Sequence, residues 1–293
     1  IIQEIGMNAD TPDDVVGDDF QLTAYPNQTL GAPILGLSNV VAAMPRDAVV
    51  KYVKTHYTPR STVISAAGAI DHDDFVRLVS DAFSELPPDT GAGFEPARYV
   101  GGECRTDKDH EQAHILLGFQ GIERTDPGYY NVVALAHILG GGMSSRLFQE
   151  IRENRGLVYN IHAFHSAYRD DGIFGVYAGT GPDSIAELID VLSRELIQFA
   201  GSVTEIEIDR TRAQLKSSLL MGRESMMTRA DQNAKHLIFH NRVLNTDDLR
   251  GRIDAISADG ISTLARRIFV THPTLAALGP IGQLVDYNTL RGK

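Results

Sequence analysis

Apolar residues recur along most of this chain with the period of an α-helix. Runs in which apolar side chains return every three to four positions predict helices that bury one face and expose the other. Capping residues mark several starts: Thr11 before Pro12, Asp71, and Thr204 with Glu207. The predicted helical segments are 1–7 (the end of a helix), 11–24, 48–56, 74–86, 126–139, 182–199, 204–243 with a break near 224–225, 248–256 and 259–269.

Shorter apolar runs that are rich in β-branched residues predict strands. Two of these runs flank an Asp-Asp-Gly turn at 170–172, which is typical of a hairpin. The predicted strands are 62–69, 112–121, 158–168, 173–179 and 274–278. Strands mixed with packed helices predict an α+β fold built from mixed α/β layers.

The length and one composition shift predict the domain organisation. A chain of 293 residues corresponds to about two domains. Residues 87–100 are rich in proline and glycine and show no periodicity, which is typical of a linker. We therefore expect one domain in 1–86 and a second in 101–293.

Composition and charge narrow the class of partner. The formal net charge of −11 argues against binding to nucleic acid or to an anionic membrane, and it is compatible with a basic peptide. No apolar run is long enough to span a bilayer. The single cysteine, Cys104, excludes an internal disulfide framework and favours a reducing compartment such as the cytoplasm. Because the chain starts at Ile1 in the middle of a predicted helix, we expect that a longer protein extends upstream.

Residues 140–159 read GGGMSSRLFQEIRENRGLVY and carry the most specific signal in the chain. The three glycines predict a loop, since glycine is costly inside a helix. A short helix should follow, end at Gly156 and lead into a strand. No Lys-Ser or Lys-Thr follows the glycines, so this is not a phosphate-binding P-loop. From composition alone, the commoner interpretation is a loop, a helix and a strand within a core.

This stretch resembles the signature of the carboxy-terminal domain of the pitrilysin family of zinc peptidases. The family includes mitochondrial processing peptidase and insulysin, and its zinc motif is the inverted H-x-x-E-H. The resemblance implies that Arg152 and Tyr159 are the pair that this domain contributes to the catalytic cleft. Tyr159 would help to stabilise the oxyanion of the tetrahedral intermediate, and Arg152 would help to hold the substrate backbone.

The first 68 residues resemble the second half of the catalytic domain in processing-peptidase-like members. In that resemblance Glu4 falls on the third zinc ligand, a carboxylate downstream of the H-x-x-E-H helix. Without the resemblance, a lone glutamate on a helix is nearly always a solvated residue.

Two further carboxylates match family positions. Asp14 and Asp18 lie four residues apart and so share a helix face. The resemblance implies that they bind an arginine near the cleavage site of a basic presequence. The alternative is a solvated acidic face near a helix N-terminus.

The sequence contains no H-x-x-E-H motif, but one segment matches a different zinc-binding motif. His110-Glu111-Gln112-Ala113-His114 matches H-E-x-x-H, a zinc motif that must lie on a helix. Here it leads into a predicted strand, where four residues span about 13 Å, too far for two ligands of one zinc ion. We therefore reject it as a metal site.

Taken together, the resemblance implies a zinc metalloendopeptidase built from two similar α/β units, the first of them incomplete here. Its cofactor is zinc, and its substrate is a peptide or unfolded polypeptide, with which a basic sequence is compatible. We expect the chain alone to be inactive, because one carboxylate cannot hold catalytic zinc. Two alternatives stay open: a non-catalytic peptide-binding subunit of the same fold, and a structural subunit. A homodimer, or a heterodimer with a related subunit, is compatible with all three.

Overall fold

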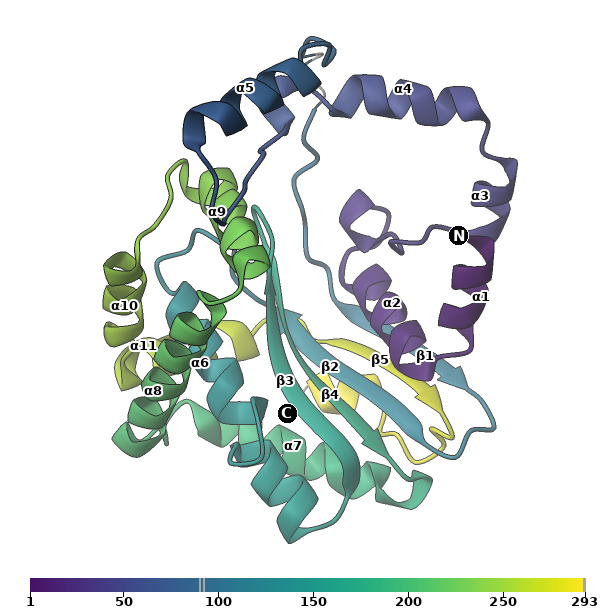
Figure 1. Cartoon of the computed structure of the whole chain (residues 1–293). Helices are drawn as coiled ribbons and strands as arrows, with labels where there is room; N and C mark the ends of the chain where they lie inside the picture. Colours follow the sequence, from purple (N-terminus) through teal and green to yellow (C-terminus); the bar gives the residue numbers. More distant parts are fainter. Residues whose placement is uncertain (90, 92, 292–293) are drawn as a thin grey trace. The chain divides into compact units, whose positions relative to one another are not determined.

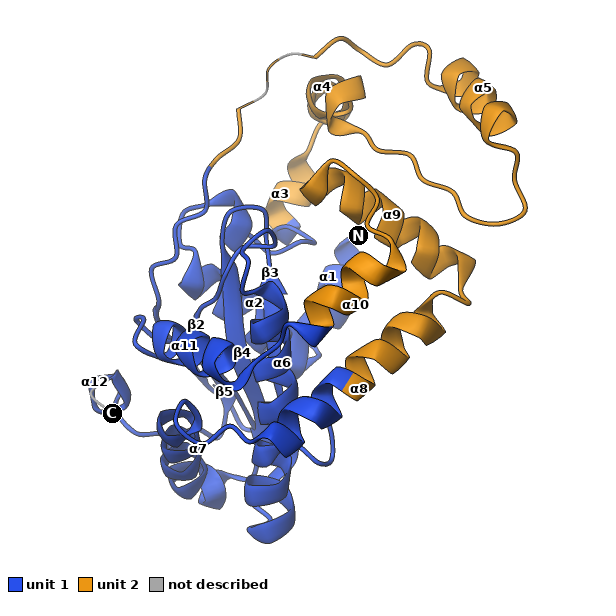
Figure 2. Ribbon diagram, turned by 90° about the vertical axis from the view of Figure 1, so that its left-hand side faces the viewer, with its two compact units in different colours: residues 1–38, 96–212, 254–293 blue, residues 39–95, 213–253 orange. Residues whose placement is uncertain are grey.

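The computed structural model describes residues 1–89, 91 and 93–291, and these form two compact units. Figure 2 shows both units, each assembled from segments that are distant in the sequence. Unit 1 consists of Ile1–Ser38, Pro96–Arg212 and Asp254–Lys293. Unit 2 consists of Asn39–Glu95 and Ala213–Ile253. The predicted division at 87–100 stays a prediction, and residues 90 and 92 of that predicted linker lie outside the described residues.

A five-stranded mixed sheet forms the centre of unit 1 (Figure 1). The order of the strands across the sheet is β1-β5-β2-β4-β3, so β1 and β3 are its edges. β1 runs parallel to β5, and all other neighbours are antiparallel. The strands are β1 (Gly102–Asp107), β2 (Ala113–Gln120), β3 (Val158–Ala167), β4 (Gly172–Thr180) and β5 (Thr274–Gly279).

The period of two along β2 assigns helices to the two faces of the sheet. Gly118 lies so close to Phe20 of α2 (Pro12–Ala24) that an added Cβ would be 2.5 Å from the Phe20 Cζ atom. The next residue, Phe119, points to the other face, where its ring lies 5.4 Å from that of Phe269 in α11 (Ala258–Phe269). One face of the sheet therefore carries α2, and the opposite face carries α11.

The packing of α2 explains why a helix with five acidic residues in or just before it folds onto a sheet. Its apolar residues Val16, Phe20 and Ala24 recur every four positions and are buried. They join a core cluster with residues of β2, β4 and β5, including Leu116 and Tyr177. Full burial of a large apolar side chain stabilises by about 1.5–3 kcal/mol. The predicted start is confirmed, with Thr11 at the N-cap and Pro12 as the first helical residue.

The remaining helices of unit 1 follow the predicted order, apart from short ones that the pattern did not indicate. Thr204 and Glu207 form the predicted capping box at the start of α8, where the Thr204 backbone N–H donates to Glu207 Oε2 at 2.9 Å. This helix continues from unit 1 into unit 2. The helices are α1 (Ile2–Ala9), α6 (Tyr129–Gly140), α7 (Ile185–Phe199), α8 (Glu205–Gly222) and α12 (Tyr287–Arg291).

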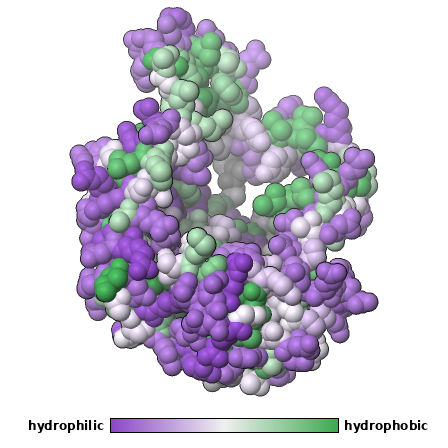
Figure 3. Space-filling view, turned by 60° about the horizontal axis from the view of Figure 1, so that its bottom comes forward, coloured by the Kyte–Doolittle hydropathy of each residue, from purple (hydrophilic) through white to green (hydrophobic). Residues whose placement is uncertain are grey.

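Unit 2 is built from helices and contains none of the five strands. Asp71 caps α5 as predicted, and Ser225 caps α9 directly after the predicted break. None of the residues in α3, α4 or α5 is buried. Apolar surface is visible among polar surface on the face drawn in Figure 3. The helices are α3 (Ser38–Ala43), α4 (Arg46–His56), α5 (His72–Ala82), α9 (Met226–His240) and α10 (Thr246–Asp254).

Two predictions about secondary structure are wrong. Residues 62–69 form no strand, because no other described segment pairs with them. Gly140 belongs to the end of α6 and not to a loop. The edge strand β1 was missed because its polar sequence, GECRTD, lacks an apolar run. The mixed helix-and-sheet class is confirmed. Among the described residues, no helix is both long and apolar enough to cross a membrane.

Candidate functional site

Arg152 lies on an irregular helical segment. Residues Phe148–Asn154 form a π-helix, a rare conformation that occurs frequently at functional sites. Arg152 is exposed, with its guanidinium carbon 4.8 Å from the centre of the Phe148 ring. The predicted stop is confirmed at Gly156, whose φ of +64° favours glycine. The segment is therefore fixed in the core at Ile151, with Arg152 presented to solvent.

Tyr159 lies on a second irregular feature, at the start of β3. Val158 pairs with Thr180 of β4 and Asn160 pairs with Gly179, so Tyr159 is the extra residue of a β-bulge. Its side chain is 63% exposed. Because β3 is an edge strand, Tyr159 stands beside backbone groups that no described strand pairs with. Bulges of this kind re-aim a side chain and are common next to active sites.

The start of the segment 140–159 is positioned by the close packing of the end of α6 against β3. A Cβ atom added to Gly140, the last residue of α6, would lie 2.2 Å from the backbone nitrogen of Ala163 in β3. Only glycine permits this approach. By contrast, no atom lies within 4 Å of a Cβ added to Gly142. A Cβ added to Gly141 would lie 2.5 Å from His137 Nδ1 of the preceding helix. Of the three glycines, Gly140 is therefore the one that packs against a different element.

The carboxylates of Asp14 and Asp18 lie on α2. Burial raises the pKa of Asp18, and repulsion from Asp14 and Asp19 adds to the rise. Neither Asp14 nor Asp18 has an ion-pair partner among the residues that the structure describes. Within the described part of the chain, no ion pair therefore offsets the charge of these two carboxylates.

The sequence did not indicate the polar network that holds the first turn of α2 to the sheet. The Tyr177 hydroxyl donates to Asp13 Oδ1 at 3.0 Å, and His114 Nδ1 lies 2.7 Å from the same oxygen and 2.8 Å from the hydroxyl. Burial lowers the pKa of His114, and Asp13 opposes this shift. The His162 ring stacks on Tyr177 with centroids 5.1 Å apart. In the sequence, the one indication of this network was that His114 lies at the start of a predicted strand.

The backbone conformation of residues 110–114 differs from the helix that the H-E-x-x-H zinc motif requires. His114 is the second residue of β2, whereas His110 lies in the loop that precedes this strand. The two residues do not share a helix, as H-E-x-x-H requires, and the strand predicted at 112–121 is confirmed. His114 is committed to Asp13 and Tyr177.

Glu4 lies on α1, whose residues contact α2. Its side chain is 64% exposed, and its carboxylate lies 3.3 Å from the amino group of Ile1. No group of three or more histidine, cysteine or acidic residues in the described part of the chain could hold a metal ion. The residues present therefore do not by themselves fit a zinc ion, which needs at least three protein ligands.

All five predicted site residues belong to unit 1. Asp14 and Asp18 share a face of α2, while Arg152 and Tyr159 lie on the contacting segments Phe148–Asn154 and β3. Within the described ranges, no hydrogen bond or ion pair joins Glu4, Arg152 or Tyr159 to one another. Their assigned roles stay predictions.

Known proteins resemble this chain in sequence along its whole length. A family model described as Peptidase M16 inactive domain matches residues 43–215. A Rickettsia felis protein named an uncharacterized zinc protease is 36% identical over 297 residues, covering 100% of this chain and 69% of the relative. The Bacillus subtilis uncharacterized zinc protease YmxG is 33% identical, covering 97% and 70%. A probable beta subunit of mitochondrial-processing peptidase from Arabidopsis thaliana is 33% identical, covering 99% and 58%.

The fold agrees with a solved structure. A chain of complex III2 from Candida albicans, determined with Inz-5 bound, superposes with a TM-score of 0.90 at 21% identity. The match covers 99% of this chain and 72% of the other. This likeness shows the fold, in which the edge strand with the bulged tyrosine contacts the π-helical segment that carries Arg152. The chain belongs to the M16 peptidase family, so the resemblance found at residues 140–159 is confirmed.

Proposed function

We propose that this chain is part of a zinc-dependent metalloendopeptidase of the processing-peptidase type, which cleaves peptides. The observation that carries the proposal is the 36% identity, over the whole chain, to a protein named a zinc protease. The 33% identity to a probable beta subunit of mitochondrial-processing peptidase supports the processing type.

We assign the zinc to a site that this chain completes but does not form alone. Glu4 offers one carboxylate, and the described residues offer no second and third ligand beside it. The sequence has no H-x-x-E-H motif. The histidine pair and the general base therefore come from another segment, joined to this chain or carried by a partner subunit. When bound, the zinc would polarise the scissile carbonyl and activate a water molecule.

The chain's own residues would act on the substrate. The exposed Tyr159 hydroxyl would donate to the oxygen on which negative charge develops, and Arg152 would hold the peptide backbone. The edge position of β3 supports this assignment, because an extended peptide can pair with a free strand edge. Asp14 and Asp18 would bind an arginine of the substrate, whose charge would offset their mutual repulsion.

Complementation in trans tests the proposal. The chain is mixed with a polypeptide that carries an H-x-x-E-H helix, and zinc content and cleavage of an arginine-containing peptide are measured. We expect one zinc ion per complex, and cleavage only when both parts are present. Tyr159→Phe should lower kcat about 10²–10³-fold, as loss of an oxyanion donor does, whereas Tyr57→Phe at an exposed tyrosine of unit 2 should not. Equal rates for both variants would overturn the role of Tyr159.

The proposed role of Asp14 and Asp18 in substrate selection is tested with two peptides. Asp14→Asn and Asp18→Asn should raise KM for a peptide with arginine near the scissile bond, and should leave KM unchanged for a peptide with glutamine there. A rise of KM for both peptides would show that the carboxylates stabilise the fold and do not select the substrate.

The alternative is a non-catalytic subunit that binds peptides or has a structural role. The absence of H-x-x-E-H from these 293 residues favours it. Peptide binding without zinc uptake or cleavage in the complemented mixture would support a peptide-binding subunit. Absence of peptide binding would support a structural one. Association as a homodimer, or as a heterodimer with a related subunit, is part of the proposal and is measured by light scattering in the same mixtures.

A further inference from the structure

A cavity of about 440 Å³ opens on the face of the sheet opposite to α2. Its floor is Leu117 and Phe119 of β2, which are buried, and its walls come from α7, α11 and α12. The apolar lining continues to the rim, where Ile197 is 60% exposed. The volume lies in the range of about 300–1,000 Å³ that is typical of small-molecule sites. All lining residues belong to unit 1.

Two of the four polar residues in this lining are already engaged with the protein. Ser193 donates its hydroxyl hydrogen to the Ile189 carbonyl at 2.7 Å. The Thr271 hydroxyl donates to the Ile268 carbonyl at 2.7 Å and accepts from the Gln120 backbone N–H at 3.1 Å. Neither hydroxyl therefore has a hydrogen left to donate to a ligand.

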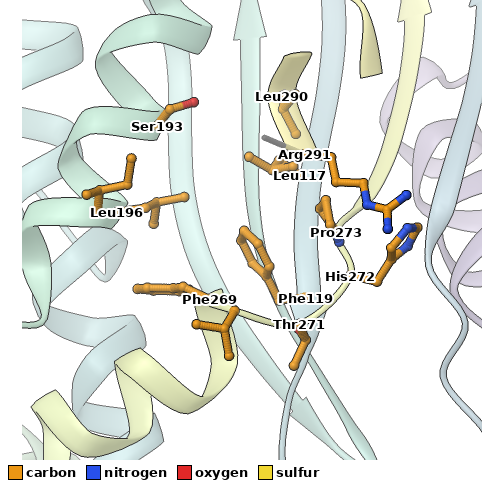
Figure 4. A pocket seen from close by; sticks show the side chains of 12 residues that line it. Leu117, Phe119, Ser193, Leu196, Phe269, Thr271, His272, Pro273, Leu290 and Arg291 are labelled. Atoms are coloured by element: carbon orange, nitrogen blue, oxygen red, sulfur yellow. The ribbon is translucent and has the colours of Figure 1, made fainter. Parts of the chain in front are cut away.

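The other two polar residues of the lining, His272 and Arg291, lie at one end of the cavity, where Arg291 provides a positive charge. Figure 4 shows Arg291 and His272 near each other there, with Leu196 and Phe269 on the opposite side. The Tyr287 hydroxyl donates to the Pro273 carbonyl at 2.5 Å, so its oxygen accepts from His272 Nδ1–H at 3.2 Å. Arg291 is therefore the donor that this end of the cavity offers to a ligand. Among the described residues, Arg291 has no ion-pair partner. Burial raises the pKa of Tyr287, and the nearby positive charge of Arg291 opposes the rise.

We propose that this cavity binds a small amphipathic carboxylate, of the class of a medium-chain fatty acid. The hydrocarbon chain would lie against Leu117, Phe119 and Leu196, where apolar contact is the only interaction offered. The carboxylate would accept hydrogen bonds from the Arg291 guanidinium. Arginine suits this role because its planar fork matches a carboxylate. An uncharged ligand would leave the guanidinium unmatched, and a cationic one would be repelled by it.

Binding of decanoate to the full chain tests the assignment by titration calorimetry. Decanoate should bind, while decanol should bind at least tenfold more weakly and decyltrimethylammonium not measurably, because only the carboxylate matches the guanidinium. Arg291→Gln should weaken decanoate about tenfold or more and leave decanol unchanged. Arg210→Gln, at an exposed arginine of α8 outside the cavity, is the control and should have no effect.

A second pair of variants tests the apolar wall without disturbing the core. Ile197→Asp, at the exposed rim, should weaken the binding of decanoate, whereas Ile206→Asp, at another exposed position, on α8, should not. The proposal is overturned if decanoate does not bind, if decyltrimethylammonium binds as tightly, or if Arg291→Gln and Arg210→Gln have equal affinities.

Discussion

Helices α7 in unit 1 and α5 in unit 2 have similar amphipathic sequences but opposite environments. In α5, Phe75, Leu78, Val79 and Ala82 share one face, yet no residue of this helix is buried. In α7 the apolar face is packed. Its buried residues are Ile185, Leu188, Ile189, Val191, Leu192, Ser193, Leu196 and Phe199.

The difference teaches that an amphipathic pattern specifies a face to be covered and leaves the covering partner unspecified. Unit 1 contains all five strands, and its helices can pack on a sheet or on one another. Unit 2 contains no described strand, so α4 and α5 keep their apolar faces exposed. The apolar segment 62–69 likewise lacks a strand to pair with.

The largest effect should separate two leucines that differ only in environment. Leu188 of α7 is fully buried, so Leu188→Ala should lower the free energy of unfolding by about 2–5 kcal/mol. Leu78 of α5 is 68% exposed, so Leu78→Ala should change it by less than about 0.5 kcal/mol. Urea unfolding followed by circular dichroism measures both. Equal losses would show that α5 is covered in solution.

The next effect concerns His165, a half-buried histidine of unit 1. Burial lowers the pKa of His165 from 6.5 to about 4, so the folded state holds it neutral while the unfolded state takes up a proton. The contribution of His165 to the free energy of unfolding should therefore be fully present above pH 6.5. It should fall by about 3 kcal/mol as the pH drops towards 4. His165→Gln should flatten this decline, whereas His56→Gln at an exposed position of α4 should not. The test is to measure the free energy of unfolding of the parent chain and of both variants from pH 7 to pH 4.

A smaller effect is expected within the glycine run. Gly140→Ala places a methyl group against the backbone of Ala163 and should destabilise the fold by about 1–3 kcal/mol. Gly142→Ala meets open space and should change stability by less than about 0.5 kcal/mol. Thermal unfolding of the two variants provides the measurement. A larger loss for Gly142→Ala would contradict the packing role of Gly140.

The smallest change in stability is expected on the exposed face of unit 2. Leu78→Lys should alter the free energy of unfolding by less than about 0.5 kcal/mol, because the side chain remains in solvent. It should nevertheless reduce binding of the dye ANS, which reports exposed apolar surface. Arg77→Ala, on the same helix, is the control and should leave dye binding unchanged. Unchanged dye binding in Leu78→Lys would mean that this face is already covered.

Local chemistry allowed the sequence to determine the helix starts, the hairpin and the family. The side chains of Asp71 and Glu207 accept from backbone N–H groups within three residues, and Pro12 fits the first helical position, so no distant contact is needed. The pairing of 158–168 with 173–179 followed from alternation around a short turn. Arg152 and Tyr159 were chosen as candidates from the motif at 140–159, and no geometry was needed for that choice.

The tertiary structure alone decided which segments are covered and which polar groups meet. Asp13, His114 and Tyr177 are separated by up to 164 residues, so no local pattern could join them. Residues 62–69 have the composition of a strand, but a strand needs a neighbour, and none of the described segments is one. The polar strand β1 forms because β5 offers a parallel edge. A sequence encodes the surfaces that can pair, and the folded chain determines which of them have a partner.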